Sequence, residues 1–131
     1  MRLALAGFLA FVLAGIAVGQ EQIPTTTATG AILRGLDTAN GHLVDLDVPN
    51  GGMINFERLE ITVQECRYPT ENPASDAFVY LTIRDIREDA PRFEGWMIAS
   101  SPAISALDHP RYDVWVLRCK MPEPEPETSE G

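Results

Sequence analysis

The stretch Asn40–Val48, NGHLVDLDV, joins an Asn-Gly pair to a run in which apolar and polar residues alternate. Its valines and Leu46 fall on one face of such a run, whereas Asp45 and Asp47 fall on the other. Asn-Gly before an alternating run is a strong signal for a type I′ β-hairpin. The preceding strand-like run, Ala31–Asp37, is therefore expected to pair with His42–Val48 across a turn at positions 38–41.

The same texture of short apolar runs and turn residues continues outward from this hairpin. Six or seven short strands, with turn signals every eight to twelve residues, predict an all-β fold, a small antiparallel β-sandwich or barrel. Two runs, Phe93–Ala99 and Tyr112–Cys119, are apolar on both sides, so we expect these strands to be covered on both faces. The further expected strands are Met53–Phe56, Leu59–Cys66, Ala77–Ile83, Phe93–Ala99 and Tyr112–Cys119.

One short helical turn is expected between the last two strands. Ser100 or Ser101 can cap it, Pro102 suits its first position, and Ala103–Leu107 supplies about one and a half turns before Asp108–Pro110 ends it. A longer helix here would make the fold α+β, which is the alternative to the all-β prediction.

The first 19 residues have the pattern of an export signal. A positive start at Arg2 is followed by an uncharged run, and Ala17 and Gly19 provide small residues for cleavage. An uncleaved anchor is the alternative, although a span usually needs about 20 apolar residues. We expect a signal peptide over 1–19, a flexible arm over 20–29, a β-domain over 30–120 and a disordered acidic tail over 121–131.

Export makes a disulfide between Cys66 and Cys119 the most economical use of the two cysteines. Strict alternation from Leu59 places Cys66 on the outward side of its strand. Either a β-bulge near Glu65 turns this residue inward, or the disulfide lies at the margin of the sheet. The loop closed by the bond is long, so the disulfide is expected to stabilise the fold by about 4 kcal/mol.

The charge balance excludes whole classes of partner. Nineteen acidic residues against ten basic ones give a net charge of -9. Nucleic acid is therefore not an expected partner, because its phosphates would be repelled. Membrane contact is expected to be only indirect, or through an uncleaved signal segment.

The sequence offers little catalytic chemistry. Ser100 or Ser101 with His109 and Asp108 or Asp113 has the side chains of a hydrolytic triad, but no G-x-S-x-G elbow surrounds either serine. The cysteines and histidines lack zinc spacing, and the pair Asp45 and Asp47 lacks the further oxygen ligands that calcium needs. We therefore predict no catalytic residue, no metal and no cofactor.

Aromatic residues suggest a ligand-binding alternative. Trp96 and Trp115, with neighbouring tyrosines and phenylalanines, could form a stacking platform for a glycan or another flat ligand. Large rings more often fill the core of a small domain, so we expect both tryptophans to be buried.

A long motif near the carboxyl end resembles a known family. The run Gly95–Pro110, GWMIASSPAISALDHP, continues into Tyr112–Leu117 and Cys119, and together with earlier stretches it is similar to the alphaproteobacterial exported family catalogued as domain of unknown function 2155. The resemblance covers roughly Ala31–Cys119 and implies a periplasmic or envelope location without an established activity. Its genes often lie beside one for an accessory subunit of respiratory NADH dehydrogenase, which implies a place near a respiratory membrane complex. The earlier stretches are Leu33–Asp37, Asp45–Pro49 and Leu59–Cys66.

Together these observations predict a periplasmic, non-catalytic β-domain that acts through contacts with an unidentified envelope protein, as an accessory or assembly factor. A small-ligand or glycan-binding module is the alternative, and a hydrolase is the third possibility. Small residues in the long motif would allow another surface to approach closely. The candidate interaction surface comprises Trp96, Ser100, Ser101, Pro102, Leu107 and His109.

Overall fold

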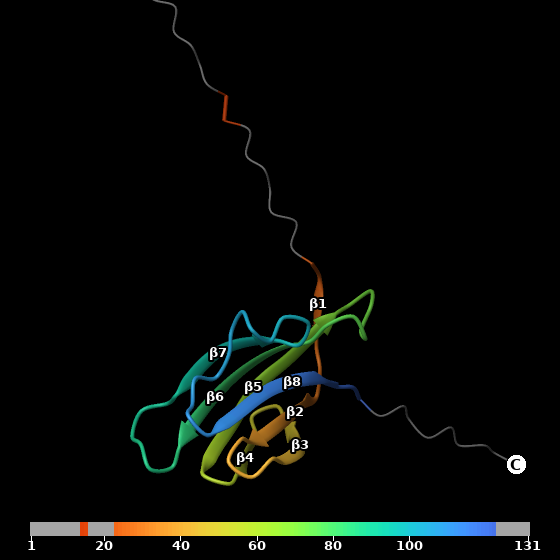
Figure 1. Cartoon of the computed structure of the whole chain (residues 1–131). Coiled ribbons are helices and arrows are strands. Elements are labelled where there is room, and N and C mark those ends of the chain that lie inside the picture. The colour runs from red at the N-terminus through yellow and green to blue at the C-terminus, as the bar shows by residue number, and fades with distance from the viewer. Residues whose placement is uncertain (1–13, 16–22, 123–131) are drawn as a thin grey trace, which may run out of the picture.

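The computed structural model describes residues 14–15 and 23–122, and eight antiparallel strands form two sheets within them (Figure 1). The expected signal peptide and acidic tail lie almost entirely outside these residues. The strands are β1 (Thr25–Thr27), β2 (Gly30–Asp37), β3 (His42–Pro49), β4 (Met53–Phe56), β5 (Leu59–Pro69), β6 (Phe78–Asp85), β7 (Phe93–Ile98) and β8 (Tyr112–Lys120).

The two sheets stack face to face as a sandwich, which confirms the all-β prediction. One sheet has the order β1-β5-β6-β7, with β4 also paired to β5, and the other has the order β3-β2-β8. The core lies between the sheets because alternate residues of each strand point inward, as Val79, Leu81 and Ile83 of β6 do. Each such side chain contributes about 1.5–3 kcal/mol through burial.

The strand count is eight because the segment expected to be a flexible arm contains β1. Thr25–Thr27 pairs with Arg67–Pro69 at the end of β5. The Arg67 guanidinium donates to the hydroxyls of Thr25 and Thr27, each at 2.8 Å. The prediction was wrong for these three residues because side-chain hydrogen bonds from a distant strand do not show in local periodicity.

A β-bulge in β5 decides the direction of Cys66. The pairing of β5 with β6 shifts register between Val63 and Glu65, and Cys66 is completely buried as a result. Its disulfide with Cys119 joins β5 of one sheet to β8 of the other. The predicted disulfide is confirmed, and of the two alternatives for Cys66 the structure shows the bulge.

The β2–β3 hairpin is present, but its turn differs from the prediction. Asp37 and His42 form the last pair, and the loop has four residues, with positive φ at Gly41 and not at Asn40. A type I′ turn needs positive φ at both central residues. Thr38 instead bonds to the backbone oxygen of Arg111 through its amide and its hydroxyl, at 2.9 and 2.7 Å, which separates the strands early.

The predicted helical turn at Pro102–Leu107 was wrong. Pro102–Ile104 forms a turn, the residues after it are irregular, and the structure shows no helix in residues 23–122. Ser100 does not cap a helix, because its amide and hydroxyl both bond to the Asp76 carboxylate, at 3.0 and 2.6 Å. The described residues therefore contain no helix with the length and apolar character needed to cross a membrane.

The last two strands are not covered on both faces. In β7 only Met97 is buried, whereas Trp96 is 41% exposed. In β8 buried and less buried residues alternate, and Trp115 is half-buried. The prediction failed because residues 23–122 form two layers, so only one face of each strand is buried against the other sheet.

Candidate functional site

The connection from β7 to β8 runs along the side of the sandwich where both of these edge strands lie. It starts beside the amino-terminal end of β6, where the Ala99 amide donates to the Ala77 carbonyl at 2.9 Å. It ends beside the other end of β6, where the His109 ring contacts Asp85. Leu107 is buried against the core between these points. We call residues 99–111 the side loop.

Strand β8 presents an unpaired backbone edge toward the side loop. The Thr38 amide donates to the Arg111 carbonyl, so this carbonyl faces β2. In an antiparallel ladder this direction alternates, so the N–H and C=O groups of Val114 and Val116 face away from β2. No strand of residues 23–122 pairs with this edge of β8.

An apolar hollow of about 430 Å³ lies between the side loop and the first half of β8. Its single ionisable lining residue is Asp113, which is exposed and has no ion-pair partner within residues 23–122. The lining residues of this apolar hollow are Pro102, Ala103, Ala106, Leu107, Asp113, Val114 and Trp115.

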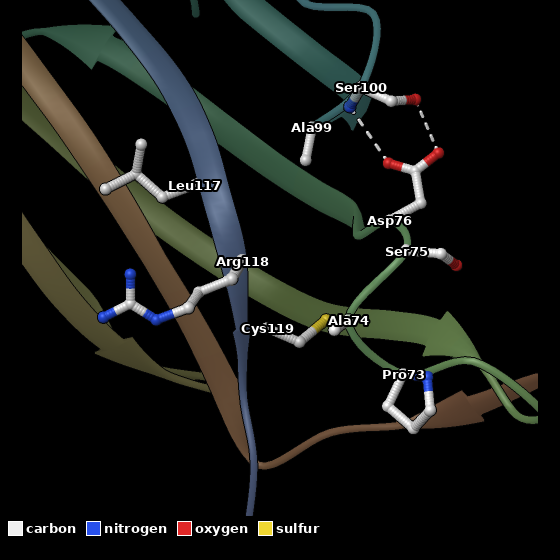
Figure 2. Close-up of a pocket in the computed structure, with 9 residues that line it drawn as sticks. All are labelled: Pro73, Ala74, Ser75, Asp76, Ala99, Ser100, Leu117, Arg118 and Cys119. Carbon is white, nitrogen blue, oxygen red and sulfur yellow. Dashed lines mark hydrogen bonds between the residues drawn. The ribbon is translucent and has the colours of Figure 1, made fainter.

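A second hollow, of about 290 Å³, lies along the carboxyl-terminal end of β8 (Figure 2). Leu117–Cys119 forms one wall, and the loop at 73–76 with Ala99 and Ser100 forms the other. Figure 2 shows the side chains of Leu117 and Arg118 pointing away from Ser100 and Asp76. We call this the polar hollow. The two hollows therefore lie along one strand edge.

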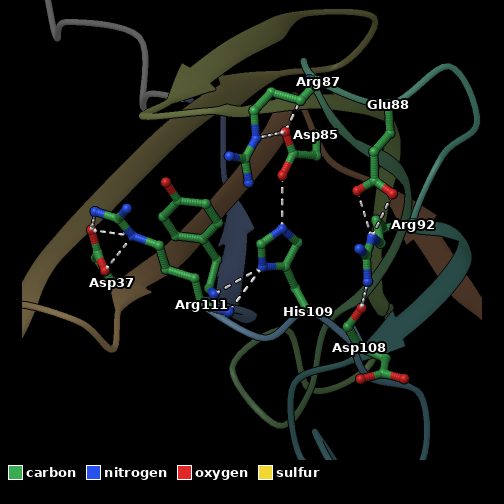
Figure 3. A network of polar contacts seen from close by, with 9 residues as sticks. Asp37, Asp85, Arg87, Glu88, Arg92, Asp108, His109 and Arg111 are labelled. Carbon is green, nitrogen blue, oxygen red and sulfur yellow. Dashed lines mark hydrogen bonds and ion pairs between the residues drawn. The ribbon is translucent and has the colours of Figure 1, made fainter.

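A polar network occupies the end of the sandwich where β8 begins (Figure 3). His109 Nδ1 accepts hydrogen bonds from the amides of Arg111 and Tyr112, at 3.0 and 3.2 Å. The proton of the neutral ring must therefore lie on Nε2, which donates to the Asp85 carboxylate at 2.9 Å. The amide of Arg87 and then His109 lower the pKa of Asp85 to about 2.

A second buried carboxylate anchors the same end. Asp37 accepts from the Arg111 guanidinium at 2.8, 3.0 and 3.2 Å, and these contacts hold the pKa of Asp37 well below its usual range. The same guanidinium also lies 5.4 Å from the Tyr112 ring centroid, and Arg58 lies at the same distance. Asp37 also raises the pKa of neighbouring Glu57. These contacts fix the turn from which β8 starts.

The polar groups of this network already have partners among residues 23–122. Asp85, Glu88 and His109 place ligand atoms within 4.8 Å of one another. A metal on His109 Nε2 would displace the only proton of a ring whose other nitrogen already accepts two hydrogen bonds, leaving an unfavourable imidazolate. Glu88 is neutralised by Arg92 at 2.7 Å. The Ser100 hydroxyl bonds to Asp76, whereas the hydrogen-bond partners of the His109 ring among residues 23–122 are Asp85, Arg111 and Tyr112.

The structure separates the residues of the predicted interaction surface. Pro102 and Leu107 line the apolar hollow, and Ser100 lines the polar hollow. Ser101 holds the side loop, since its amide donates to the Ile98 carbonyl at 3.2 Å. The His109 ring is enclosed, with a side chain only 1% exposed, so it contributes nothing to a surface.

The aromatic and acidic candidates have other partners. Trp96 packs edge-on against Tyr80, with ring centroids 5.4 Å apart, and lines neither hollow. Asp45 pairs with Arg34 and Asp47 pairs with Lys120, so both carboxylates are neutralised by cations.

Sequence reasoning missed Asp113 and Trp115 as parts of one hollow. Both were visible as an outward carboxylate and a large ring two positions apart in the last strand. Only the path of the side loop brings Pro102 and Ala106 opposite them.

Fold and site together define a small β-sandwich whose two sheets are joined by one buried disulfide, with an open strand edge beside an apolar hollow. The chain belongs to the family described as "Uncharacterized protein conserved in bacteria (DUF2155)", whose model matches residues 31–119.

A relative from Rickettsia prowazekii (strain Madrid E), named only as an uncharacterized protein, is 27% identical over 67 residues. The match covers 49% of this chain and 43% of the relative, so the chain spans less than half of that protein. No solved structure matches the chain.

Proposed function

We propose that this protein is an exported accessory or assembly factor of the bacterial cell envelope, which acts by binding another protein and not by catalysis. The observation that carries the proposal is the unpaired edge of β8 beside the apolar hollow. Exposed strand edges are usually protected, because they pair readily with other chains. An edge left open beside an apolar wall is therefore suited to a protein contact.

The buried disulfide supports a periplasmic location. Such bonds persist in oxidising compartments and are rare in a reducing cytosol. The amino-terminal pattern over 1–19 supports export in the same way. The enclosed His109 ring supports a non-catalytic role, since both of its nitrogens are already engaged.

Site-specific photo-cross-linking in the native envelope tests this proposal. A photoreactive residue at Ala103, in the wall of the apolar hollow, should give a discrete cross-linked protein band that mass spectrometry can identify. The matched control is Gln64, which is exposed on β5 away from the hollow and should give no such band. A subunit of a respiratory complex in the band would support a place near such a complex. Equal products at both positions, or none at Ala103, would count against a protein-binding role.

A further inference from the structure

The outer edge of β8 offers an extended chain the hydrogen-bonding row that a neighbouring strand would use. Peptide groups of Val114 and Val116 face this side, and the apolar hollow lies directly beside Val114. Addition of a strand to an open sheet edge takes its affinity from such backbone bonds and its specificity from pockets for alternate side chains.

We propose that this edge binds an extended segment of another protein, with apolar residues that fill the hollow and a Lys or Arg that pairs with Asp113. This inference rests on the proposed protein-binding function and specifies its ligand. Charge selects the ligand, because Asp113 is the single ionisable group of the hollow and has no cationic partner within residues 23–122. The net charge of -9 also favours a basic segment.

The chain's own carboxyl-terminal residues do not have this chemistry. The sequence beyond Pro122, EPEPETSEG, carries four glutamates and no basic residue, so Asp113 would repel it. Pro122, Pro124 and Pro126 occupy alternate positions, and proline has no amide proton to donate to a strand edge. The ligand is therefore expected to come from another protein.

Synthetic peptides test the inference on the chain without the expected signal peptide, residues 20–131. The probes are seven-residue capped peptides with lysine at both ends and alternating valine and threonine between them. In two further peptides, isoleucine or phenylalanine replaces the central valine. Matched peptides carry glutamate in place of lysine, or N-methyl groups on alternate residues. Binding is measured by NMR of the backbone amides and by Trp115 fluorescence in a Trp96→Phe background.

The lysine peptides should shift the amide signals of Val114 and Val116 and slow their hydrogen exchange. Glutamate peptides should bind at least about tenfold more weakly because their charge repels Asp113. The affinity of the N-methylated peptides should fall by a similar factor, because they lack the amide protons that bond to the strand edge. Asp113→Asn should weaken the lysine peptides about threefold to fivefold, more at low salt. Glu94→Gln, at an exposed carboxylate outside both hollows, should leave affinity unchanged.

Several results would overturn the inference. These are equal binding of the lysine and glutamate peptides, tolerance of N-methylation, insensitivity to Asp113→Asn, or no binding by any probe. Pairing of two copies of this chain through β8, detected by analytical ultracentrifugation, would also overturn it. A cross-link at Ala103 with no peptide binding would leave the proposed function standing and remove only the strand-addition mechanism.

Discussion

His109 Nε2 donates to the Asp85 carboxylate at 2.9 Å, and this bond ties the end of the side loop to the end of β6. The other ring nitrogen holds the amides of Arg111 and Tyr112, where β8 begins. One imidazole therefore sets the point at which the edge strand leaves the side loop. The residue that most resembled a catalytic base in the sequence is part of the scaffold.

Replacing His109 should destabilise the fold. His109→Ala would leave the buried Asp85 carboxylate and two amides without their partner, so the free energy of unfolding should fall by on the order of 3 kcal/mol. Urea denaturation followed by circular dichroism measures this. His42→Ala, at the exposed histidine, is the control and should change stability by less than about 0.5 kcal/mol. Equal effects at both histidines would contradict the scaffold role.

Acid should weaken the fold through its buried carboxylates. Asp85 has a pKa lowered to about 2 in the folded state, against about 3.9 in an unfolded chain. Its contribution is therefore fully present above pH 4 and is lost as the pH falls toward 2. Asp37 acts in the same direction, because its pKa is also depressed. Denaturation between pH 2 and 5 measures how the free energy of unfolding changes with pH. This change should be less steep for Asp85→Asn than for the native chain, and an equal steepness would be evidence against this linkage.

The disulfide should account for a large share of stability. The bond closes a loop with a sequence separation of 53, so Cys66→Ser with Cys119→Ser should lower the free energy of unfolding by about 4 kcal/mol. Thermal unfolding with and without reductant measures this. Reductant should destabilise the native chain and leave the double variant unaffected. Two free thiols in denatured periplasmic material would contradict an oxidised native state.

Gly35 is required by close packing. A Cβ at this position would lie 3.0 Å from the ring of Phe56, which is buried against Tyr112. Gly35→Ala should therefore cost about 1–3 kcal/mol of stability. Phe56→Leu makes room, so the double variant should lose less than the sum of the two single losses in chemical denaturation. Strict additivity would show that the two residues do not interfere.

Arg67 should hold β1 on the sheet. Its guanidinium bonds to Thr25 and Thr27, so Arg67→Gln should speed hydrogen exchange in a peptide covering residues 23–29. Exchange in β6 should not change. Arg84→Gln, which removes an ion pair with Glu60, is the control and should leave β1 protected. Unchanged exchange after Arg67→Gln would assign the stability of β1 to backbone pairing alone.

Local alternation located most strands because side chains of a strand point to opposite faces, and one face of each sheet is buried. For Cys66 it left two alternatives, a bulge near Glu65 or a disulfide at the sheet margin, and the structure shows the bulge. It failed at Thr25–Thr27, at the hairpin turn and at Pro102–Leu107. At Thr25–Thr27 and at the hairpin turn, hydrogen bonds to the distant residues Arg67 and Arg111 replace local preferences. Just before Pro102, the expected helix cap Ser100 bonds instead to Asp76.

The amino-acid sequence by itself determined the fold class, the cysteine pairing and the family, because alternation, turn residues and a long motif are all properties of neighbouring positions. Only the tertiary structure decided that the His109 ring is enclosed, that Trp96 is exposed and that Asp113 faces an apolar hollow. The physical reason is that burial and hydrogen-bond partners depend on which strand forms a sheet edge and where the side loop crosses it.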